Sequence, residues 1–230
     1  MKVLVTRPAE DGAEIARKLA EMGHEALLVP LLTVELLDGE PLKLDDVQAI
    51  LATSANGVRA LAGRTRARDL PLFAVGPQTA AAAEKAGFIR VRNAAGDART
   101  LAEQVTDWAD PAAGILLHAR GEEAGGELAQ TLRAKGYQVR GEALYRVRAA
   151  REFPAEAADL SRGGRAQAAL FFSPRSAKVF AECATRAGLS TKGLIAVCIS
   201  QNTADALQGL AFSEIRVAAA PNQTDLLACL

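Results

Sequence analysis

An ungapped internal repeat constrains the fold of this chain more than any other feature of its sequence. Residues 6–34 align with residues 119–147 at a constant offset of 113 positions, and Arg7 falls opposite Arg120. Two glycines, two leucines and a valine coincide in the same stretch. The periodicity of α/β proteins alone would not generate an ungapped run with matched glycines and arginines. We therefore expect two copies of one structural unit.

Weaker similarities extend the repeat beyond these segments. ATSANGVRALA resembles FSPRSAKVFA, and VGPQTAAA resembles ISQNTADA. Each copy is then expected to run strand, helix, strand, linker strand, and then further strands and helices.

Short apolar segments alternate with helical patterns along the whole chain. In the first helical pattern, over residues 10–22, Ile15, Leu19 and Met22 fall on one face, and Gly23 stands at the helix end. Such alternation indicates a parallel sheet with helices on both faces. The expected strands are 3–6, 25–31, 49–54, 72–76, 89–93, 114–120, 169–173, 195–200 and 214–220.

Two longer extended segments, 31–38 and 142–149, alternate in polarity, as half-exposed antiparallel strands do. If they pair, the chain leaves one domain through the first segment and returns through the second. The predicted fold class is α/β, with two doubly wound parallel-sheet domains joined by a two-stranded linker and able to hinge. The expected boundaries are 1–36 with 148–230 for a flavodoxin-like domain, 40–141 for the second domain, and 31–38 with 142–149 for the linker.

Composition argues against several functional classes. The formal net charge is zero, so no overall field attracts nucleic acid, and the basic run 64–68 is expected to be a solvated loop. No signal-peptide pattern and no long apolar run are present, which predicts a cytoplasmic protein without membrane spans. The three cysteines, Cys183, Cys198 and Cys229, lack metal-ligand spacing and are interpreted as buried or incidental thiols.

Ligands of open parallel sheets bind beyond the carboxyl ends of the strands. Here the turns at those ends are TRPAED, TSANG, VGPQTA, HARGEE, FSPRS and ISQNTA. They are rich in hydroxyl, amide, glycine and arginine residues, and the helices that follow offer unpaired N–H groups and partial positive charge. Any single turn is better explained by helix capping, but the whole set, facing one cleft, favours a large ligand with several anionic groups.

The third turn shows the pattern in detail. We expect Gly76 to let the backbone approach a ligand, Pro77 to stiffen the start of the helix and Thr79 to present its hydroxyl. The candidate substrate-binding residues of all six turns are Arg7, Ser54, Asn56, Gly76, Pro77, Gln78, Thr79, Arg120, Ser173, Arg175, Ser176, Gln201, Asn202 and Thr203.

Strong catalytic motifs are missing from the sequence. No P-loop, GxGxxG or convincing Ser-His-Asp spacing occurs, and His118 is expected in the core or at a strand end. Tyr145 lies in the middle of a linker strand, where simple packing and a catalytic role are equally open interpretations.

The order and spacing of VTRP, TSANGV, VGPQTA, RGEEAGGELAQTLRAKGYQV, LYRV and FFSPRSAKVF resemble the uroporphyrinogen-III synthase family over nearly the whole chain. The resemblance implies a lyase that acts on hydroxymethylbilane, a linear tetrapyrrole with acetate and propionate groups. Loss of the hydroxyl as water gives an azafulvene, and a spiro intermediate then inverts the terminal ring, in the biosynthesis of heme, siroheme or cobalamin. The resemblance implies no metal and no organic cofactor.

The resemblance also assigns roles to residues. It implies that Tyr145 donates the proton to the leaving hydroxyl, and that Thr79, Thr203, Ser54 and Ser173 line the cleft. A substrate that cyclises unaided to the wrong isomer mainly needs to be held in the productive shape, which suits a site without a strong nucleophile. Two positions depart from the family pattern: Ser200 replaces a usual glycine, and Arg175 replaces smaller residues, as a carboxylate clamp or an exposed side chain.

Two alternatives to the synthase remain open from the sequence. One is a cytoplasmic bilobal binding or sensor protein for an anionic ligand, and the other is a synthase-like protein that binds tetrapyrroles without turnover. The expected partners are a small polycarboxylate substrate and, transiently, the preceding pathway enzyme that hands it over. No nucleic acid and no membrane partner is expected.

Overall fold

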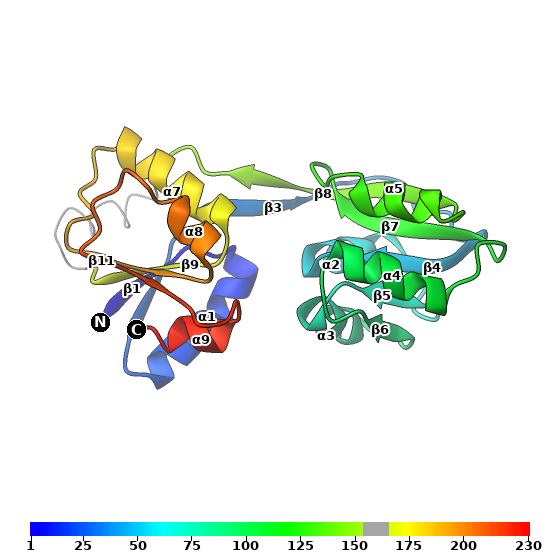
Figure 1. Cartoon of the computed structure of the whole chain (residues 1–230), viewed down its shortest axis with the longest axis horizontal. Coiled ribbons are helices and arrows are strands. Elements are labelled where there is room, and N and C mark those ends of the chain that lie inside the picture. Colours follow the sequence, from blue (N-terminus) through cyan, green and yellow to red (C-terminus); the bar gives the residue numbers. More distant parts are fainter. Residues whose placement is uncertain (154–165) are drawn as a thin grey trace. The chain divides into compact units, whose positions relative to one another are not determined.

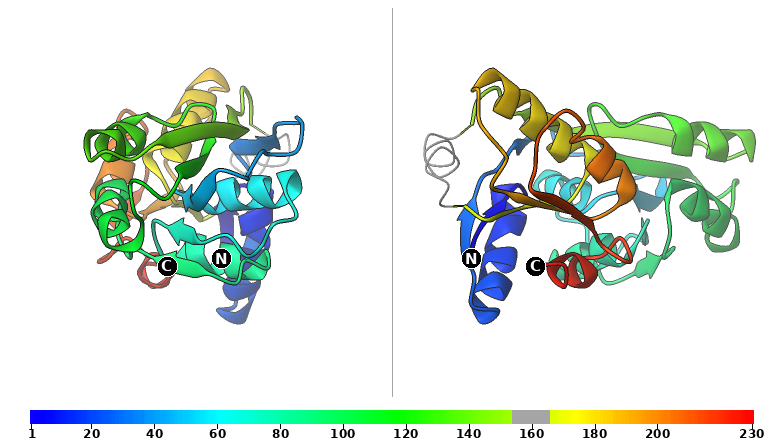
Figure 2. Two further views of the ribbon diagram at one scale, coloured as in Figure 1. Left: turned by 90° about the vertical axis from the view of Figure 1, so that its right-hand side faces the viewer. Right: turned by 60° about the vertical axis from the view of Figure 1, so that its left-hand side comes forward.

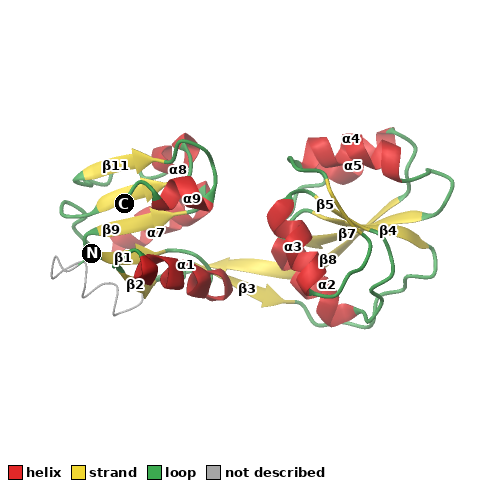
Figure 3. Cartoon of the chain, turned by 90° about the horizontal axis from the view of Figure 1, so that it is seen from below, coloured by secondary structure: helices red, strands yellow, loops and turns green. Residues whose placement is uncertain are grey.

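The structure is a computed structural model that describes residues 1–153 and 166–230. The chain divides into two compact units, unit 1 with Met1–Thr33 and Arg148–Leu230, and unit 2 with Val34–Val147. Unit 1 is a parallel sheet and unit 2 is a parallel sheet extended by one antiparallel edge strand, each covered by helices on both faces, which confirms the predicted fold class (Figure 3).

Unit 1 contains a five-stranded sheet in which every pair of neighbours is parallel. The order is β11-β10-β9-β1-β2, which is the flavodoxin order when strands are numbered along the unit. Both chain termini belong to this unit (Figure 2). Its strands are β1 (Lys2–Val5), β2 (Glu25–Leu28), β9 (Ala168–Phe171), β10 (Ile195–Cys198) and β11 (Glu214–Val217).

In the described residues of unit 1, helices cover both faces of this sheet, as Figure 1 shows. From one side, Ile15 and Leu19 of α1 and Leu226 of α9 pack on Val3 and Val5 in a buried cluster. This apolar face explains the helical spacing seen in the sequence, because residues three or four apart share one side of a helix. The helices are α1 (Ala9–Glu21) and α9 (Gln223–Leu227) on this face, and α7 (Pro174–Arg186) and α8 (Gln201–Asp205) on the other.

Unit 2 contains a six-stranded sheet in the order β3-β8-β7-β4-β5-β6. Helices α2 and α3 pack on one face and α4 and α5 on the other, over two separate buried clusters (Figure 3). The strands are β3 (Leu32–Leu36), β4 (Val47–Ala52), β5 (Leu72–Ala74), β6 (Val91–Asn93), β7 (Ile115–Gly121) and β8 (Val139–Ala149). The helices are α2 (Ala55–Arg64), α3 (Pro77–Lys85), α4 (Ala98–Trp108) and α5 (Glu127–Ala134).

The two segments expected to link the domains are β3 and the second half of β8, and they pair with each other. The Leu37 amide donates to the Leu144 carbonyl and the Ala150 amide donates to the Leu31 carbonyl, each at 2.9 Å. Because the partners run in opposite directions along the sequence, the pair is antiparallel. The boundaries between the units fall inside these two strands.

The sheet register makes the internal repeat visible in the structure. Strand β1 pairs with β9 as β7 pairs with β4, so Leu4 opposite Ala169 corresponds to Leu117 opposite Ile50. Replacing each strand of unit 1 by its repeat counterpart yields the order β6-β5-β4-β7-β8 of unit 2. Each unit therefore combines the first part of one sequence copy with the later part of the other.

The basic run 64–68 is only in part the solvated loop that the sequence predicted: Arg66 is exposed, but Arg64 and Arg68 bond the backbone. The Arg68 guanidinium donates to four backbone carbonyls, including that of Ala86 at 2.8 Å, and lies over the Phe88 ring. The Arg64 guanidinium donates to the carbonyls of Leu37 and Glu40. These two side chains thus bond backbone carbonyls at the end of α2 and in the segments around it, a use of arginine that charge counting does not reveal.

Candidate functional site

All six turns of interest follow parallel strands, so within each unit they share the carboxyl edge of the sheet. In unit 1 they follow β1, β9 and β10, and in unit 2 they follow β4, β5 and β7. Ligands of such sheets bind at this edge, above all where the strand order reverses. The reversal lies between β1 and β9 in unit 1 and between β4 and β7 in unit 2.

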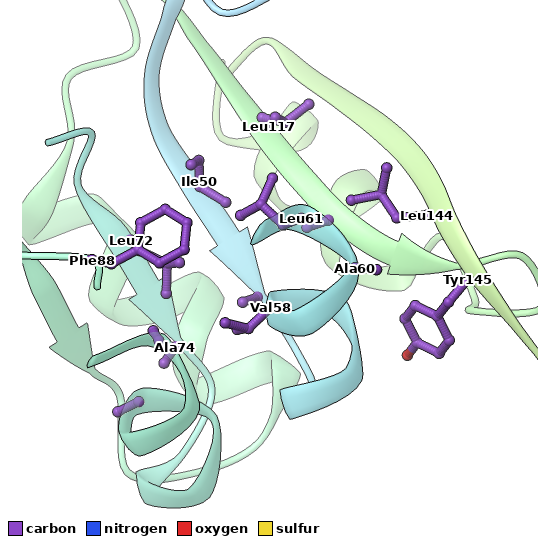
Figure 4. Close-up of a cluster of buried hydrophobic side chains, with 14 of the residues drawn as sticks. Ile50, Val58, Ala60, Leu61, Leu72, Ala74, Phe88, Leu117, Leu144 and Tyr145 are labelled. Atoms are coloured by element: carbon purple, nitrogen blue, oxygen red, sulfur yellow. The ribbon is translucent and has the colours of Figure 1, made fainter. Parts of the chain in front are cut away.

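The reversal point of unit 2 brings together two residues that the sequence singled out separately. The Ser54 hydroxyl and the Tyr145 hydroxyl are 2.8 Å apart, although the residues are far apart in the chain. Ser54 is the N-cap of α2, where its Oγ accepts a hydrogen bond from the Gly57 amide at 3.0 Å. Tyr145 comes from β8 and is only 9% exposed, at the margin of the apolar cluster under α2 (Figure 4).

Two glycines make this contact sterically possible. A Cβ at Gly121 would lie 3.0 Å from Tyr145 Cζ, and a Cβ at Gly57 would lie 2.7 Å from the Ala119 carbonyl oxygen. A side chain at Gly121 would displace the phenol ring, and one at Gly57 would move the start of α2. Neither role could be predicted from the sequence, because the repeat offers no matching glycine at either position.

The start of α3 in unit 2 leaves several polar groups exposed. Gly76 is the N-cap in an extended conformation, Pro77 occupies the first turn, and both Pro77 and Gln78 are exposed. A Cβ at Gly76 would meet only the Gly96 carbonyl oxygen, at 3.8 Å, so this unit's own packing does not require a glycine there. Thr79 is 5% exposed, and its hydroxyl makes no hydrogen bond within the described residues.

Unit 1 repeats the serine cap with different partners. Ser173 occupies the register position that corresponds to Ser54, and its Oγ accepts from the Ser176 amide at 3.1 Å. The Ser176 hydroxyl, which is buried, donates to the Ser173 carbonyl and lies 3.1 Å from Ser173 Oγ. Arg175, next to this cap, is exposed.

The start of α8 matches that of α3 in backbone but not in side chains. Ser200 has nearly the dihedral angles of Gly76, with φ −159° against −160°. Its Oγ lies 3.0 Å from Oγ1 of the fully buried Thr203. Ser200 therefore supplies its threonine with a hydroxyl partner that Gly76 cannot offer to Thr79, and it does so without a change of backbone. Gln201 bonds Asp205 and, like Asn202, is exposed.

The remaining predicted residues also lie at the two carboxyl edges. The Arg7 guanidinium stacks on the Phe172 ring, with 4.7 Å from Cζ to the ring centroid, in unit 1. In unit 2, the Arg120 guanidinium donates to the carbonyls of Gly121 and Glu122, and the Asn56 Oδ1 accepts from Arg59 at 2.7 Å. The candidates thus lie at the carboxyl edge of the sheet in each unit.

The buried titratable groups support a structural interpretation. His118 is 2% exposed, with Nε2 3.3 Å from Thr53 Oγ1, and burial together with the charge of Arg120 lowers the pKa of His118 to about 4. Burial raises the pKa of the Cys198 thiol to about 12 and also raises the pKa of Cys183. The three cysteines are unpaired, two of them buried, as the sequence predicted.

The described residues contain neither a metal-ligand cluster nor a helix fit to span a membrane. No group of three or more histidine, cysteine or acidic side chains in residues 1–153 and 166–230 could hold a metal ion. Within the same residues, no helix has the length and apolar character needed to cross a membrane.

Comparison with known protein families identifies the family to which this chain belongs. The family model described as uroporphyrinogen-III synthase HemD matches residues 13–228. The chain belongs to the uroporphyrinogen-III synthase family. The resemblance carried by the turn motifs is thereby confirmed, and the family is one of enzymes. No curated protein matches the sequence.

Solved structures of uroporphyrinogen-III synthases share this fold. The uroporphyrinogen-III synthetase of Helicobacter pylori 26695 has a TM-score of 0.68 at 17% identity, covering 99% of this chain and 97% of that one. A mutant uroporphyrinogen III synthase of the extremely thermophilic bacterium Thermus thermophilus has a TM-score of 0.56 at 18% identity, covering 100% and 96%. At such low identity these structural likenesses support only the fold, and the evidence for the function is the family membership.

Proposed function

We propose that this chain is a lyase that converts hydroxymethylbilane into uroporphyrinogen III, with loss of water and inversion of the terminal pyrrole ring. Family membership supports the reaction, and we assign the proton of its first step to Tyr145, whose hydroxyl lies 2.8 Å from that of Ser54. That step needs a proton for the leaving hydroxyl. A phenol is an appropriate donor, since it carries a proton at neutral pH and can take one back.

The substrate's acetate and propionate groups are proposed to bind the hydroxyls, amides and arginines of the six turns. Helix N-termini offer N–H groups and partial positive charge to carboxylates. Thr79 adds a hydroxyl at α3 that has no partner among the described residues, and Arg7 and Arg120 add positive charge. Many weak contacts of this kind hold a flexible polyanion in one shape, which accelerates one ring closure over another. Arg175, Asn56, Gln78, Gln201 and Asn202 complete the proposed contacts.

The chemistry of the substrate also bears on its supply. Because hydroxymethylbilane cyclises without help to the wrong isomer, we propose direct transfer from the enzyme that produces it, in the cytoplasm. Direct transfer is tested by mixing this chain with the enzyme that produces hydroxymethylbilane and adding an inactive variant of this chain as a competitor. Competition that lowers the yield of the type III isomer supports it, and free diffusion predicts no effect.

Product isomers decide the proposed function. Freshly prepared hydroxymethylbilane is incubated with the protein, and the products are oxidised and resolved by chromatography. We expect the type III isomer to dominate, whereas the enzyme-free control yields type I. A type I product with the enzyme present would rule out the synthase and leave a binding protein.

The role of Tyr145 is tested by Tyr145→Phe, which removes one oxygen atom. We expect a turnover lower by about tenfold or more, since general acid catalysis typically contributes at least that much. A thermal denaturation curve controls for folding. An unchanged rate and isomer ratio would remove Tyr145 from the mechanism.

A further inference from the structure

We propose that Ser54 is a positioning residue for Tyr145: its hydroxyl donates a hydrogen bond to the phenol oxygen and so directs the phenolic proton toward the substrate's leaving hydroxyl. This inference rests on the proposed function and assigns to Ser54 a role other than direct substrate binding. The observation behind it is the 2.8 Å contact of the two hydroxyls.

The hydrogen-bond inventory of Ser54 restricts the possible proton arrangements. A serine hydroxyl has one proton to donate and two lone pairs to accept with. One lone pair is used by the Gly57 amide at 3.0 Å. If Tyr145 donated its proton to the other lone pair, it would have none to give to the substrate. If Ser54 donates instead, the phenolic proton stays free, and only this arrangement serves proton donation.

The two side chains are also held rigidly, so the arrangement persists. Ser54 is fixed by its capping bond and its extended backbone, with φ −157° and ψ 153°. The Tyr145 ring is packed in the cluster beneath α2 and lies directly on Gly121. A buried phenol oxygen has few partners to choose from, and a fixed neighbour decides where its proton points.

Comparison of the two sequence copies distinguishes the positioning role of Ser54 from its role as a helix cap. Ser173 caps α7 as Ser54 caps α2, with the same backbone conformation. The position that corresponds to Tyr145 in the first sequence copy is Leu32, which has no hydroxyl. Ser173 pairs with the Ser176 hydroxyl instead, at 3.1 Å. Capping is therefore common to both copies, while the bond to a phenol is confined to unit 2.

The proposed step balances without a further reactant. The phenolic proton goes to the leaving hydroxyl, the carbon–oxygen bond breaks with its electron pair going to oxygen, and water departs. The pyrrole nitrogen's electrons stabilise the resulting cation. The phenolate accepts the Ser54 hydrogen bond, which strengthens when its acceptor is charged. Ring closure later releases a proton from a pyrrole carbon, and this proton restores the phenol.

The test compares three variants in steady-state turnover to the type III isomer. Ser54→Ala removes the bond to Tyr145 and the cap together, and Ser54→Thr retains a hydroxyl. Asp97→Ala is the matched control, because Asp97 caps α4 in the same unit by accepting from the Thr100 amide at 2.9 Å. We expect Ser54→Ala to lower kcat about tenfold to a hundredfold, the range for a hydrogen bond to a charged group, with KM nearly unchanged.

The controls separate the possible roles. Ser54→Thr should recover most of kcat, and Asp97→Ala should lower the melting temperature without lowering kcat. In a Tyr145→Phe background, Ser54→Ala should have little further effect, because both changes remove the same interaction. A rise in KM alone, or a loss of kcat shared with Asp97→Ala, or an undiminished effect in that background, would overturn the inference.

Failure of the inference remains distinguishable from failure of the proposed function. A wild-type protein that gives only type I product refutes the synthase itself. A wild-type protein that gives type III product, with additive effects of the two substitutions, refutes only the positioning role. A second measurement needs no turnover: in protein labelled with carbon-13 at tyrosine Cζ, Ser54→Ala should move the Tyr145 resonance and Asp97→Ala should not. An unmoved resonance would overturn the inference as well.

Discussion

The neutral, buried imidazole of His118 makes the stability of unit 2 depend on pH in a calculable way. In the folded chain the pKa of His118 is lowered from 6.5 to about 4, chiefly by burial and secondarily by the charge of Arg120. In the unfolded chain the imidazole takes up a proton already near its usual pKa. The unfolded state therefore binds more protons between these values, and stability falls as the pH falls through them.

The magnitude follows from the two pKa values. The stability that the neutral His118 contributes is fully present above the pKa of the unfolded state and is lost below the pKa of the folded state. Between pH 7.5 and pH 5.0, linkage predicts a loss of about 2 kcal/mol from the free energy of unfolding attributable to His118 alone. This loss is a substantial part of the stability of an ordinary domain.

The assay uses denaturant unfolding followed by fluorescence of Trp108, the single tryptophan of the chain, which lies in unit 2 against Phe73. Wild type is compared with His118→Leu, which cannot titrate, and with His24→Gln, which replaces the other histidine. The difference in the free energy of unfolding between wild type and His118→Leu should change by about 2 kcal/mol from pH 7.5 to 5.0. If the free energies of unfolding of wild type and His118→Leu changed in parallel from pH 7.5 to 5.0, the reasoning would be refuted, whatever the absolute stability of the variant.

Two further predictions concern hydroxyls and thiols. Thr79→Ala should weaken substrate binding by about 1 kcal/mol with little effect on melting temperature, whereas Thr203→Ala, which loses a bond to Ser200, should lower the melting temperature as well. Equal effects on stability would contradict the contrast between the two turns. Cys198→Ser should leave the reaction of the native protein with a thiol reagent unchanged, because burial keeps this thiol protonated and inaccessible, yet lower the count in denatured protein from three thiols to two.

Much of the fold could be predicted because the local hydrophobic pattern and the internal repeat indicate the same helices and strands. The first helix was expected over 10–22 and lies at Ala9–Glu21, and each expected strand has a counterpart in the sheets. Amphipathic spacing and buried apolar runs are local signals that tertiary contacts reinforce. The repeat then supplied long-range information, since it indicated which strands belong to equivalent positions.

Other features could not be predicted, because they depend on contacts distant in sequence. Strand β8 is continuous over Val139–Ala149, while the corresponding residues of the first copy form two strands separated near Pro30. Proline cannot donate a ladder hydrogen bond, and its counterpart is Ala143. The pairing of Ser54 with Tyr145 also required the register of β8 against β7, which no motif encodes.

The comparison of the two copies indicates how one duplicated scaffold acquired unequal sites. At equivalent backbone positions, unit 2 has Gly76 beside a Thr79 hydroxyl without a partner in the described part of the chain, and unit 1 has Ser200 bonded to Thr203. The same backbone dihedral angles in both turns mean that the difference lies in the side chains and not in the scaffold. Tyr145, with its serine partner, is likewise confined to unit 2. We infer that the proton donor is confined to unit 2 because the substrate has a single leaving hydroxyl, at one end, which needs its proton donor at one place only, whereas both units contribute turns to the proposed binding of the carboxylates.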